Sequence, residues 1–216
     1  LPESELSPVR HFVVTKNAGG FALGAYDGDY LAGFVLSVPA FLRGERAFYS
    51  HMLGVRPAYQ GSGIGADLKW AQCERSLIAG IRYVKWTFEP VKARNAYFNL
   101  EKLGAIVGEY MPNFYGTDYA TEPRGLASDR LFAEWHLDTP KVQALAAGGE
   151  FAEDQPHAAT IAIMNDWAEL VETDVERAIS EQTRIRCEFE EAFARGLTAR
   201  RFRRDDAKPE FLLYAE

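Results

Sequence analysis

Apolar residues recur along the chain with two different spacings, and each spacing predicts a type of element. In the segment from residue 6 to 17 they follow near-helical spacing and two glycines come next, which predicts a short helix. Two runs rich in apolar and aromatic residues follow, at about 20 to 26 and 30 to 38, with Asp-Gly-Asp between them. Because Asp and Gly favour tight turns, these runs predict an antiparallel hairpin, and a third strand is expected from about 46 to 55.

The middle of the chain alternates between helical and strand patterns. A glycine-rich turn after residue 55 leads into a stretch whose apolar residues fit a helix from about 63 to 79. The run IRYVKWTFEP predicts a strand that ends at Pro90, and ARNAYFNLEKLG predicts a short helix closed by Gly104. AIVGEY and DRLFAEWHL predict two further strands, separated by a polar loop from 111 to 128. The order of elements indicates a mixed α/β fold.

The last third of the chain has a different pattern. After Pro140 the composition loosens, and ALAAGGEFAEDQPHA at 144 to 158 reads as a surface connection, which places a boundary between a domain at 1–140 and an extension at 141–216. Apolar residues then recur every three or four positions from Trp167 to Phe193, which predicts one amphipathic helix of about 25 residues and about 40 Å. Its apolar stripe either packs on the main sheet or forms a subunit interface. LTARRFRRDD and EFLLYA predict a closing strand pair.

Composition and charge narrow the function classes. The chain has 216 residues, 47% of them hydrophobic, and a formal net charge of -7, which argues against a nucleic-acid binder because such proteins present a basic face. Cys73 and Cys187 lack the spacing of a metal site or a disulfide framework, so we expect no metal. Neither a membrane-spanning run nor a signal peptide is evident, and we expect a cytoplasmic protein without membrane contact.

The glycine turn carries a resemblance to a known family. Gln60-Gly61-Ser62-Gly63-Ile64-Gly65 is similar to the Gln/Arg-x-x-Gly-x-Gly/Ala signature of the GCN5-related N-acetyltransferase (GNAT) superfamily, with Val55, Pro57 and Tyr59 as its usual lead-in. About 30 residues on, NLEKLG at 99 to 104 resembles the family's Tyr-Glu-Lys-Leu-Gly-Phe segment. The resemblance covers about residues 20 to 138. It implies a mostly antiparallel central sheet flanked by helices, to which residues 141–216 add strands and a long helix.

The physical chemistry of the turn agrees with this resemblance. Glycines let backbone approach an anion, and the first amides of a helix lack partners while carrying the positive end of its dipole. In the family the anion belongs to coenzyme A, which implies that the amides from Gly61 to Ala66, in a motif led by Gln60, bind it here. A purely structural turn is the alternative. The resemblance also implies that the strands at 46 to 55 and 81 to 88 separate, with backbone near Leu53 and Val55 binding the pantetheine arm of acetyl-CoA or another acyl-CoA.

The catalytic residues depart from the family pattern. The family's usual general acid is a tyrosine at the position of Leu100, and an aliphatic side chain cannot donate a proton. Tyr97, one helical turn earlier, and Asn99 are the polar neighbours that could replace it. For the base we consider His51, whose ordinary pKa suits an amine proton near neutral pH, and Glu89 at the end of a strand. Either one can instead be structural or solvated.

Acceptor and cofactor contacts are expected from the next segments. Arg94 and Asn95 begin the helix after Pro90; Asn95 is expected to contact the cofactor and Arg94 the substrate. In the loop, Asn113, Phe114 and Tyr115 stand where the family often builds its acceptor pocket, and Arg124 and Arg130 are candidate carboxylate ligands. RRFRR at 200 to 204 either meets phosphates or an acidic acyl group, or covers the edge of a sheet.

The resulting expectation is an acyl-CoA-dependent N-acyltransferase that moves an acetyl or succinyl group to the amine of a small molecule such as an amino acid. Direct transfer in a ternary complex is implied by the resemblance, and we expect a homodimer. Leu100 favours the alternative, a non-catalytic acyl-CoA-binding or interaction module. The family's first strand and helix are not evident near the N-terminus. Either they are absent from this chain, or the C-terminal strands take that place.

Overall fold

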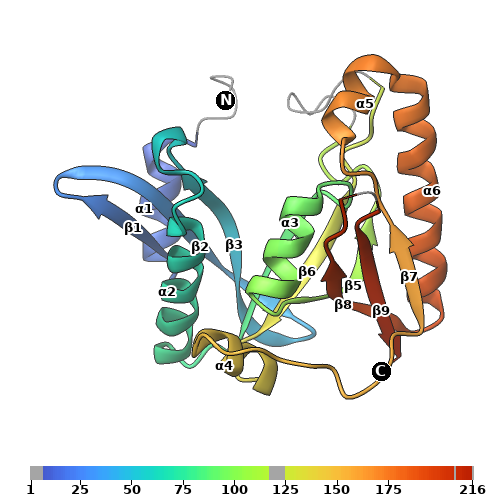
Figure 1. The fold of residues 1–216 in the computed structure, drawn as a ribbon. Helices are drawn as coiled ribbons and strands as arrows, with labels where there is room; N and C mark the ends of the chain where they lie inside the picture. Colours follow the sequence, from blue (N-terminus) through green and yellow to red (C-terminus); the bar gives the residue numbers. More distant parts are fainter. Residues whose placement is uncertain (1–6, 117–124, 207, 216) are drawn as a thin grey trace. The chain divides into compact units, whose positions relative to one another are not determined.

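The structure is a computed structural model that describes residues 7–116, 125–206 and 208–215 (Figure 1). Its contacts group the chain into two compact units, one of residues 1–86 and 134–149, the other of residues 87–133 and 150–216. The boundary falls inside β4 (Tyr83–Phe88) and β6 (Arg130–His136), each of which gives one end to each unit. The division at residue 140 between a family domain and an extension stays a prediction.

An antiparallel meander followed by a helix forms the first unit. The meander consists of β1 (Phe21–Asp27), β2 (Tyr30–Leu42) and β3 (Glu45–Val55), preceded by α1 (Val9–Asn17) and followed by α2 (Ile64–Ile78). The predicted hairpin turn is confirmed, with Asp27 paired to Tyr30 across Gly28, which has a left-handed φ of 57°. The short helix, the three strands and the helix after the glycine turn were therefore all predicted from the sequence.

The interior of the first unit lies between α2 and the sheet (Figure 1). Leu68 of α2 and Val35 of β2 are buried, and Trp135 contacts Trp70 and Trp86 with ring centroids 5.3 and 5.8 Å apart. Lys69 is also buried, with its Nζ 3.6 Å from the centre of the Trp86 ring. Burial lowers the pKa of this lysine well below its usual value.

The buried Lys69 is part of a polar network inside this core. Its Nζ donates to Ser50 Oγ at 3.1 Å and to Gln72 Oε1 at 2.8 Å, and Gln72 Nε2 donates to Ser37 Oγ at 2.7 Å. Because buried polar groups are costly unless they are hydrogen-bonded, this network fixes how α2 sits on β2 and β3.

Strands from the middle and the end of the chain form the sheet of the second unit. β5 (Ile106–Met111) lies between β6 and β8 (Leu197–Arg203), and β9 (Glu210–Ala215) and β7 (Ala159–Ala162) follow in that order. The β5–β8, β8–β9 and β9–β7 pairs are antiparallel. The predicted closing strand pair is confirmed. These C-terminal strands pair with β5 and with one another, so the alternative in which they replace a missing first strand is wrong.

One long helix was predicted after residue 166, and the structure has two. α5 (Trp167–Thr173) ends before Asp174, and α6 (Val175–Ala194) begins after it. Asp174 has an extended backbone, with φ of −152°, and its side chain accepts a hydrogen bond from the amide of Arg177 at 3.0 Å. An N-cap of this kind starts a new helix, so the prediction of a continuous helix is wrong.

The surface connection predicted at 144 to 158 is confirmed from residue 147 onward, but its first residues belong to a short helix, α4 (Pro140–Ala146). Proline at its first position has the backbone angle that a helix start requires. Thr139, Pro140 and the residues after them therefore carried a helix signal that the loose composition obscured.

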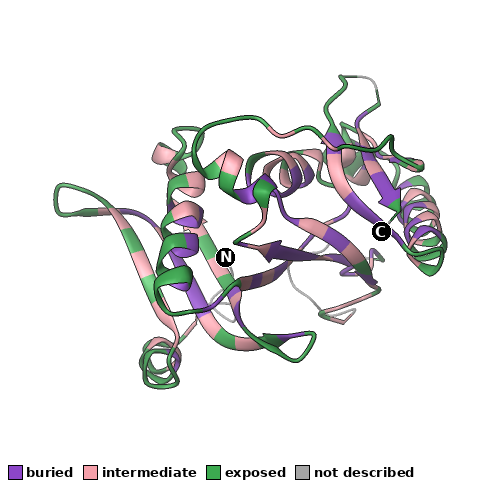
Figure 2. Ribbon diagram, turned by 90° about the horizontal axis from the view of Figure 1, so that it is seen from below, coloured by how far each residue is buried: buried purple, intermediate pink, exposed green. Residues whose placement is uncertain are grey.

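The apolar stripe of α6 packs on the sheet of its own unit, as one of the two interpretations predicted. Ala178, Ile185 and Phe189 are fully buried, and the Phe189 ring lies 5.0 Å from that of Phe211 and 5.8 Å from that of Tyr110. Figure 2 shows buried residues concentrated in the strands and exposed ones on the outer turns of the helices. The stripe is therefore covered within the chain.

Candidate functional site

The glycine turn presents a row of backbone amides without protein acceptors. Gly61 and Gly63 have left-handed φ angles of 85° and 97°, and a Cβ at either would meet nothing within 4 Å. Gly63 is the N-cap of α2 and has no side-chain cap. Among the described residues, the amides from Gly61 to Gly65 donate no hydrogen bond to the protein, while those of Ala66 and Asp67 already bond the Gly63 carbonyl at 2.8 and 3.1 Å. The turn is thus open, electropositive backbone at the start of a 15-residue helix.

Two side chains of the motif hold the turn in shape. Gln60 Nε2 donates to the Val55 carbonyl at 3.0 Å, and Ser62 Oγ donates to the Tyr59 carbonyl at 2.6 Å. Both predicted cofactor-binding side chains are therefore engaged with backbone on the strand side of the turn. Ile64, the first residue of α2, is half-buried, which anchors the helix start.

The pairing of β3 with β4 ends early. The two parallel strands pair at Phe48↔Val84 and Tyr49↔Lys85, although β3 continues to Val55. The ladder thus ends where the resemblance implies that the strands separate, and the separation itself stays a prediction. Leu53, predicted to contact the pantetheine arm, lies in the part of β3 beyond that pairing and is 40% exposed.

His51 and Ser50 are adjacent in β3 but differ in burial, and the pairing with β2 shifts register at His51, because Leu36 pairs with Met52 and Ser37 with Ser50. Ser50 is buried and accepts a hydrogen bond from Lys69 Nζ, whereas His51 is exposed and contacts His11 of α1. The His51 ring lies 5.1 Å from the ring of His11, whose Nε2 is buried without a hydrogen-bond partner among the described residues. Burial, and after it the charge of His11, lowers the pKa of His51 from its usual 6.5, so His51 is neutral at pH 7 and able to accept a proton.

Glu89 is the best-held of the predicted catalytic side chains. Lys92 Nζ donates to its Oε1 at 2.5 Å, and Asn95 Nδ2 donates to its Oε2 at 3.0 Å. Burial alone would raise the pKa of Glu89, but the hydrogen bond and charge of Lys92, with the charge of Arg130, lower it overall. Glu89 is therefore a fixed carboxylate. Asn95, which was predicted to bind the cofactor, instead uses its side-chain amide to hydrogen-bond this carboxylate.

The helix after Pro90 is distorted where the family pattern breaks. α3 (Ala93–Tyr97) passes into η3 (Phe98–Lys102), a π-helical turn in which Asn99 and Leu100 are buried. Such turns are rare and often mark functional sites. Leu100 has no exposed surface, so the residue at the family's tyrosine position belongs to the core.

Tyr97 is half-buried and keeps its ring in contact with cations. The guanidinium of Arg204 lies 4.9 Å from the ring centre, and Lys102 Nζ lies 5.7 Å from it. The neighbouring Arg94, predicted to bind substrate, is exposed. Of the two side chains, Tyr97 is the one with contacts that hold its ring in place.

The predicted acceptor residues after β5 are brought together. Asn113 adopts a left-handed φ of 47° in a turn that exposes 46% of Tyr115, and the Arg130 guanidinium lies 5.1 Å from the centre of the Tyr115 ring. Arg130 itself is buried and donates to the Asp129 carbonyl at 2.8 Å. Arg124 lies outside the described residues.

Sequence reasoning missed three contributors to this group. Lys92, which holds Glu89, had a signal in its spacing of three residues. Asp129 and Arg186, which hold the turn from Asn113 to Gly116, had none, because they lie 57 residues apart in the sequence. The RRFRR segment was interpreted as an edge strand or a phosphate site, but β8 is paired on both sides and Arg201 bonds Glu101 at 2.9 Å.

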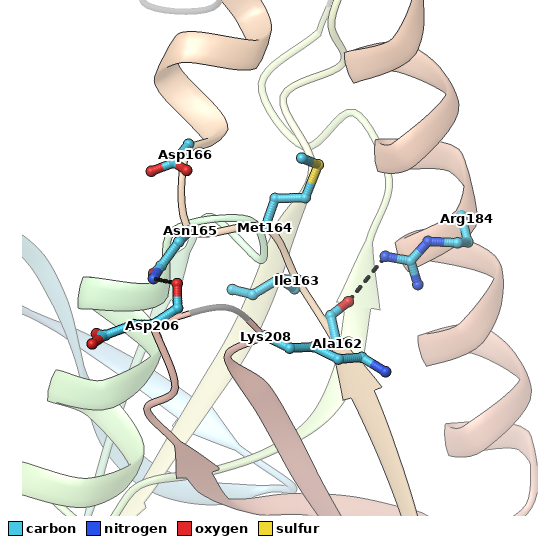
Figure 3. Close-up of a pocket in the computed structure, with 8 residues that line it drawn as sticks. All are labelled: Ala162, Ile163, Met164, Asn165, Asp166, Arg184, Asp206 and Lys208. Carbon is cyan, nitrogen blue, oxygen red and sulfur yellow. Dashed lines mark hydrogen bonds between the residues drawn. The ribbon is translucent and has the colours of Figure 1, made fainter.

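One pocket in the part of the chain that the structure describes lies apart from these residues. A pocket of about 360 Å³ is lined by residues of the C-terminal segment, among them Met164, Arg184 and Lys208, and includes none of the predicted site residues (Figure 3). In residues 7–116, 125–206 and 208–215, no group of three or more His, Cys, Asp or Glu side chains is arranged to hold a metal ion. None of the helices in those ranges combines the length and apolar character needed to cross a membrane.

Known proteins resemble the chain in family and fold. Residues 2–105 match the family described as acetyltransferase (GNAT) family. No curated protein sequence matches the chain. Among solved structures, an acetyltransferase of Bacillus subtilis in complex with CoA is similar over 62% of this chain and 85% of that one, with 15% identity and a TM-score of 0.51.

Two further structures match over a comparable length. A GNAT family acetyltransferase from Elizabethkingia anophelis with acetyl-CoA bound covers 59% of this chain and 80% of its own, with 15% identity and a TM-score of 0.49. Arabidopsis thaliana Naa50 covers 61% and 85%, with 22% identity and a TM-score of 0.48. The open glycine turn and the early end of the β3–β4 pairing both lie within residues 2–105, the part of the chain that matches the acetyltransferase (GNAT) family.

Proposed function

We propose that this protein is an acyl-CoA-dependent N-acyltransferase that moves an acetyl or succinyl group from coenzyme A to the amine of a small molecule. The observation that carries the proposal is the row of open amides from Gly61 to Gly65 at the start of α2. Such a row suits a pyrophosphate, because each amide can donate to an anionic oxygen and the helix dipole favours negative charge. The B. subtilis acetyltransferase of similar fold was solved in complex with CoA, which agrees with the same ligand here.

The reaction is a direct transfer in a ternary complex. The neutral amine attacks the thioester carbonyl carbon, a C–N bond forms, the C–S bond breaks, and the amine loses a proton. His51, which is neutral at pH 7, and Glu89, which is ionised, are the proton acceptors we propose, with Glu89 also suited to bind an ammonium group. Tyr97 is the proposed donor to the departing thiolate.

An amino acid is the acceptor class we propose. Tyr115 and Arg130 offer an aromatic surface and a cation near Glu89, which suits a ligand with both a carboxylate and an amine. The carboxylate of such a ligand would pair with the guanidinium, while its amine would lie toward Glu89. The cytoplasmic location and the homodimer stay predictions.

The second candidate is a non-catalytic acyl-CoA-binding module, and the buried Leu100 is the observation that favours it. The two candidates differ in one measurement. An enzyme releases free coenzyme A thiol from acetyl-CoA in the presence of an amine, whereas a binding module does not.

Calorimetric titration with acetyl-CoA and succinyl-CoA tests the binding site. Gly63→Glu places a carboxylate in the turn, and Gly80→Glu is the matched control, since Gly80 also has a left-handed φ and open space but lies beyond the other end of α2. Because hydrogen bonds to charged groups contribute about 1.5–3 kcal/mol each, Gly63→Glu should weaken binding by about 100-fold, while Gly80→Glu binds as the unmodified protein does.

The possible results separate the claims. Equal binding by the two variants would refute the glycine turn as the cofactor site. No binding of either thioester by the unmodified protein would refute the acyltransferase proposal and the binding-module alternative together. Thiol release with a panel of amino acids, measured on the unmodified protein, then decides between those two candidates.

A further inference from the structure

α6 is connected to the segment before β6 by two side chains that are one helical turn apart. Gln182, which is 7% exposed, receives a hydrogen bond from the Ala127 amide at 3.1 Å and donates to the Ala127 carbonyl at 2.8 Å. A single side chain thus satisfies both backbone groups of one residue. Because unpaired buried backbone groups are costly, this contact fixes the path of the chain at Ala127.

The second side chain, Arg186, forms a forked ion pair with Asp129. Its Nε lies 3.0 Å from Oδ2, and its second guanidinium nitrogen lies 2.9 Å from both carboxylate oxygens. The Asp129 side chain has no exposed surface, whereas that of Arg186 is 29% exposed. A planar fork on a fully buried carboxylate is a strong and directional contact.

Asp129 also accepts hydrogen bonds from β5 and from the turn after it. The Tyr110 hydroxyl donates to Oδ2 at 2.7 Å, and the Asn113 amide donates to Oδ1 at 2.8 Å. Burial and the hydrogen bond to Asp129 raise the pKa of Tyr110, so its hydroxyl stays protonated and remains a donor. The carboxylate therefore joins α6, β5 and the left-handed residue that opens the turn.

Ser128 holds the rest of the same turn. Its hydroxyl accepts from the Tyr115 amide at 2.8 Å and donates to the Gly116 carbonyl at 3.1 Å, and its carbonyl accepts from the Phe114 amide at 3.0 Å. The turn from Asn113 to Gly116 thus has its conformation set by Ser128 and Asp129. α6 bonds Asp129 directly through Arg186 and bonds Ala127, the residue before Ser128, through Gln182.

We propose that Arg186 is a positioning residue through which α6 sets the affinity of the enzyme for its acceptor amine. The Asp129–Arg186 pair fixes the turn that presents Tyr115, and it fixes the residue before Arg130, whose guanidinium contacts the Tyr115 ring. This inference rests on the proposed function. It assigns a role in substrate binding to a helix that lies outside the residues matching the family.

This role predicts that a change at Arg186 affects binding of the acceptor amine but not binding of acetyl-CoA. Removing Arg186 loosens the turn at Tyr115 but leaves the glycine turn of α2 untouched, since the contacts described above all lie within residues 110–130 and α6. The KM for the acceptor should therefore rise while the dissociation constant for acetyl-CoA does not change.

The experiment compares Arg186→Met with Arg184→Met. Arg184 is the matched control, because it also lies on α6 but bonds Glu181, Glu188 and the Ala162 carbonyl rather than Asp129; its bond to Ala162 is drawn in Figure 3. The acceptor is the amino acid with the fastest thiol release in the panel above. We expect Arg186→Met to raise the KM for that amino acid at least tenfold and to change the calorimetric Kd for acetyl-CoA by less than twofold, with Arg184→Met changing neither.

A second variant and a second readout keep the inference testable if Arg186→Met does not fold. Gln182→Leu removes the contact with Ala127 without burying or removing a charge, and it should raise the same KM. Amide hydrogen exchange of the turn, followed by mass spectrometry, should be faster in either variant than in Arg184→Met. Arg186→Lys, which keeps the charge but not the fork, should recover part of the acceptor affinity.

The outcomes are distinct from those of the proposed function. An unchanged acceptor KM in both Arg186→Met and Gln182→Leu, with acetyl-CoA binding intact, would overturn the positioning role alone. An equal loss of acetyl-CoA affinity would show that these residues act only through general stability and would also overturn it. A protein that releases no thiol with any amine would overturn the proposed enzyme, and the inference with it.

Discussion

Replacing Glu101 by alanine is expected to destabilise the protein by about 3 kcal/mol, because the carboxylate joins η3 to β8 through several hydrogen bonds. Arg201 Nε lies 2.9 and 3.0 Å from its two oxygens, and the second guanidinium nitrogen lies 2.9 Å from Oε2. The Phe202 amide also donates to Oε1, at 2.6 Å. The Glu101 and Arg201 side chains are 15% and 29% exposed, so both are largely removed from water.

The magnitude follows from what the substitution leaves behind. Phe202 is a buried residue, and an unsatisfied buried amide costs about 1–3 kcal/mol. Arg201 keeps its bond to the Phe151 carbonyl at 3.0 Å and regains water on its exposed part, so its share is at the lower end of the range of about 1.5–3 kcal/mol for a charged hydrogen bond. The sum is roughly 3 kcal/mol, which is within the range of about 3–5 kcal/mol for removing one partner of a buried pair.

Urea unfolding measures this loss as a shift of the midpoint at constant slope. Asp138→Ala is the control, because Asp138 pairs with Arg82 at 3.1 Å with side chains 39% and 57% exposed. Such exposed pairs contribute about 0–1 kcal/mol. A loss in Glu101→Ala no larger than the loss in Asp138→Ala would refute the argument that β8 stabilises η3 through this carboxylate.

Three further results are expected. Tyr97→Phe keeps the ring beside Arg204 but removes the hydroxyl, so kcat should fall by about 100-fold with no change in acetyl-CoA affinity by calorimetry; an unchanged kcat would exclude Tyr97 as the acid. The pKa of His51 is lowered from 6.5, so the profile of kcat/KM against pH should decline below pH 6.5 as His51 gains its proton, and His51→Gln should remove that decline. Leu100→Ala should cost about 2–5 kcal/mol in urea unfolding because Leu100 is fully buried, and a loss below about 1 kcal/mol would contradict its place in the core.

Local patterns in the sequence were sufficient for the first unit. The hairpin at Asp27 to Tyr30, the strand ending at Val55 and the helix start at Gly63 each depend on a few neighbouring residues. The glycine turn was predictable for the same reason, since positive φ angles and uncapped amides are properties of a short segment.

The features that were missed depend on residues far apart in the chain or on a balance of similar energies. Asp174 was read as one more polar position on a helix, although an aspartate favours an N-cap about as much as it tolerates a helix. Asp129 and Arg186 meet only after β5, β6 and α6 have packed, and no spacing indicates this. The arginines of β8 looked available for phosphates, but Glu101 lies against Arg201 in the folded chain.

The pairing of β5 with β8 also determines when the sheet of the second unit can form during translation. Val107 of β5 pairs with Ala199 of β8, so about 90 residues must be synthesised after β5 before its partner exists, which takes roughly 5–20 s at about 5–20 residues per second. Until β8 is synthesised, the edge of β5 that faces it has no strand partner, whereas the hairpins of the first unit have had time to form. The second unit therefore completes its sheet only after β8 has been synthesised, and until then the nascent chain is exposed to chaperones and to misassembly.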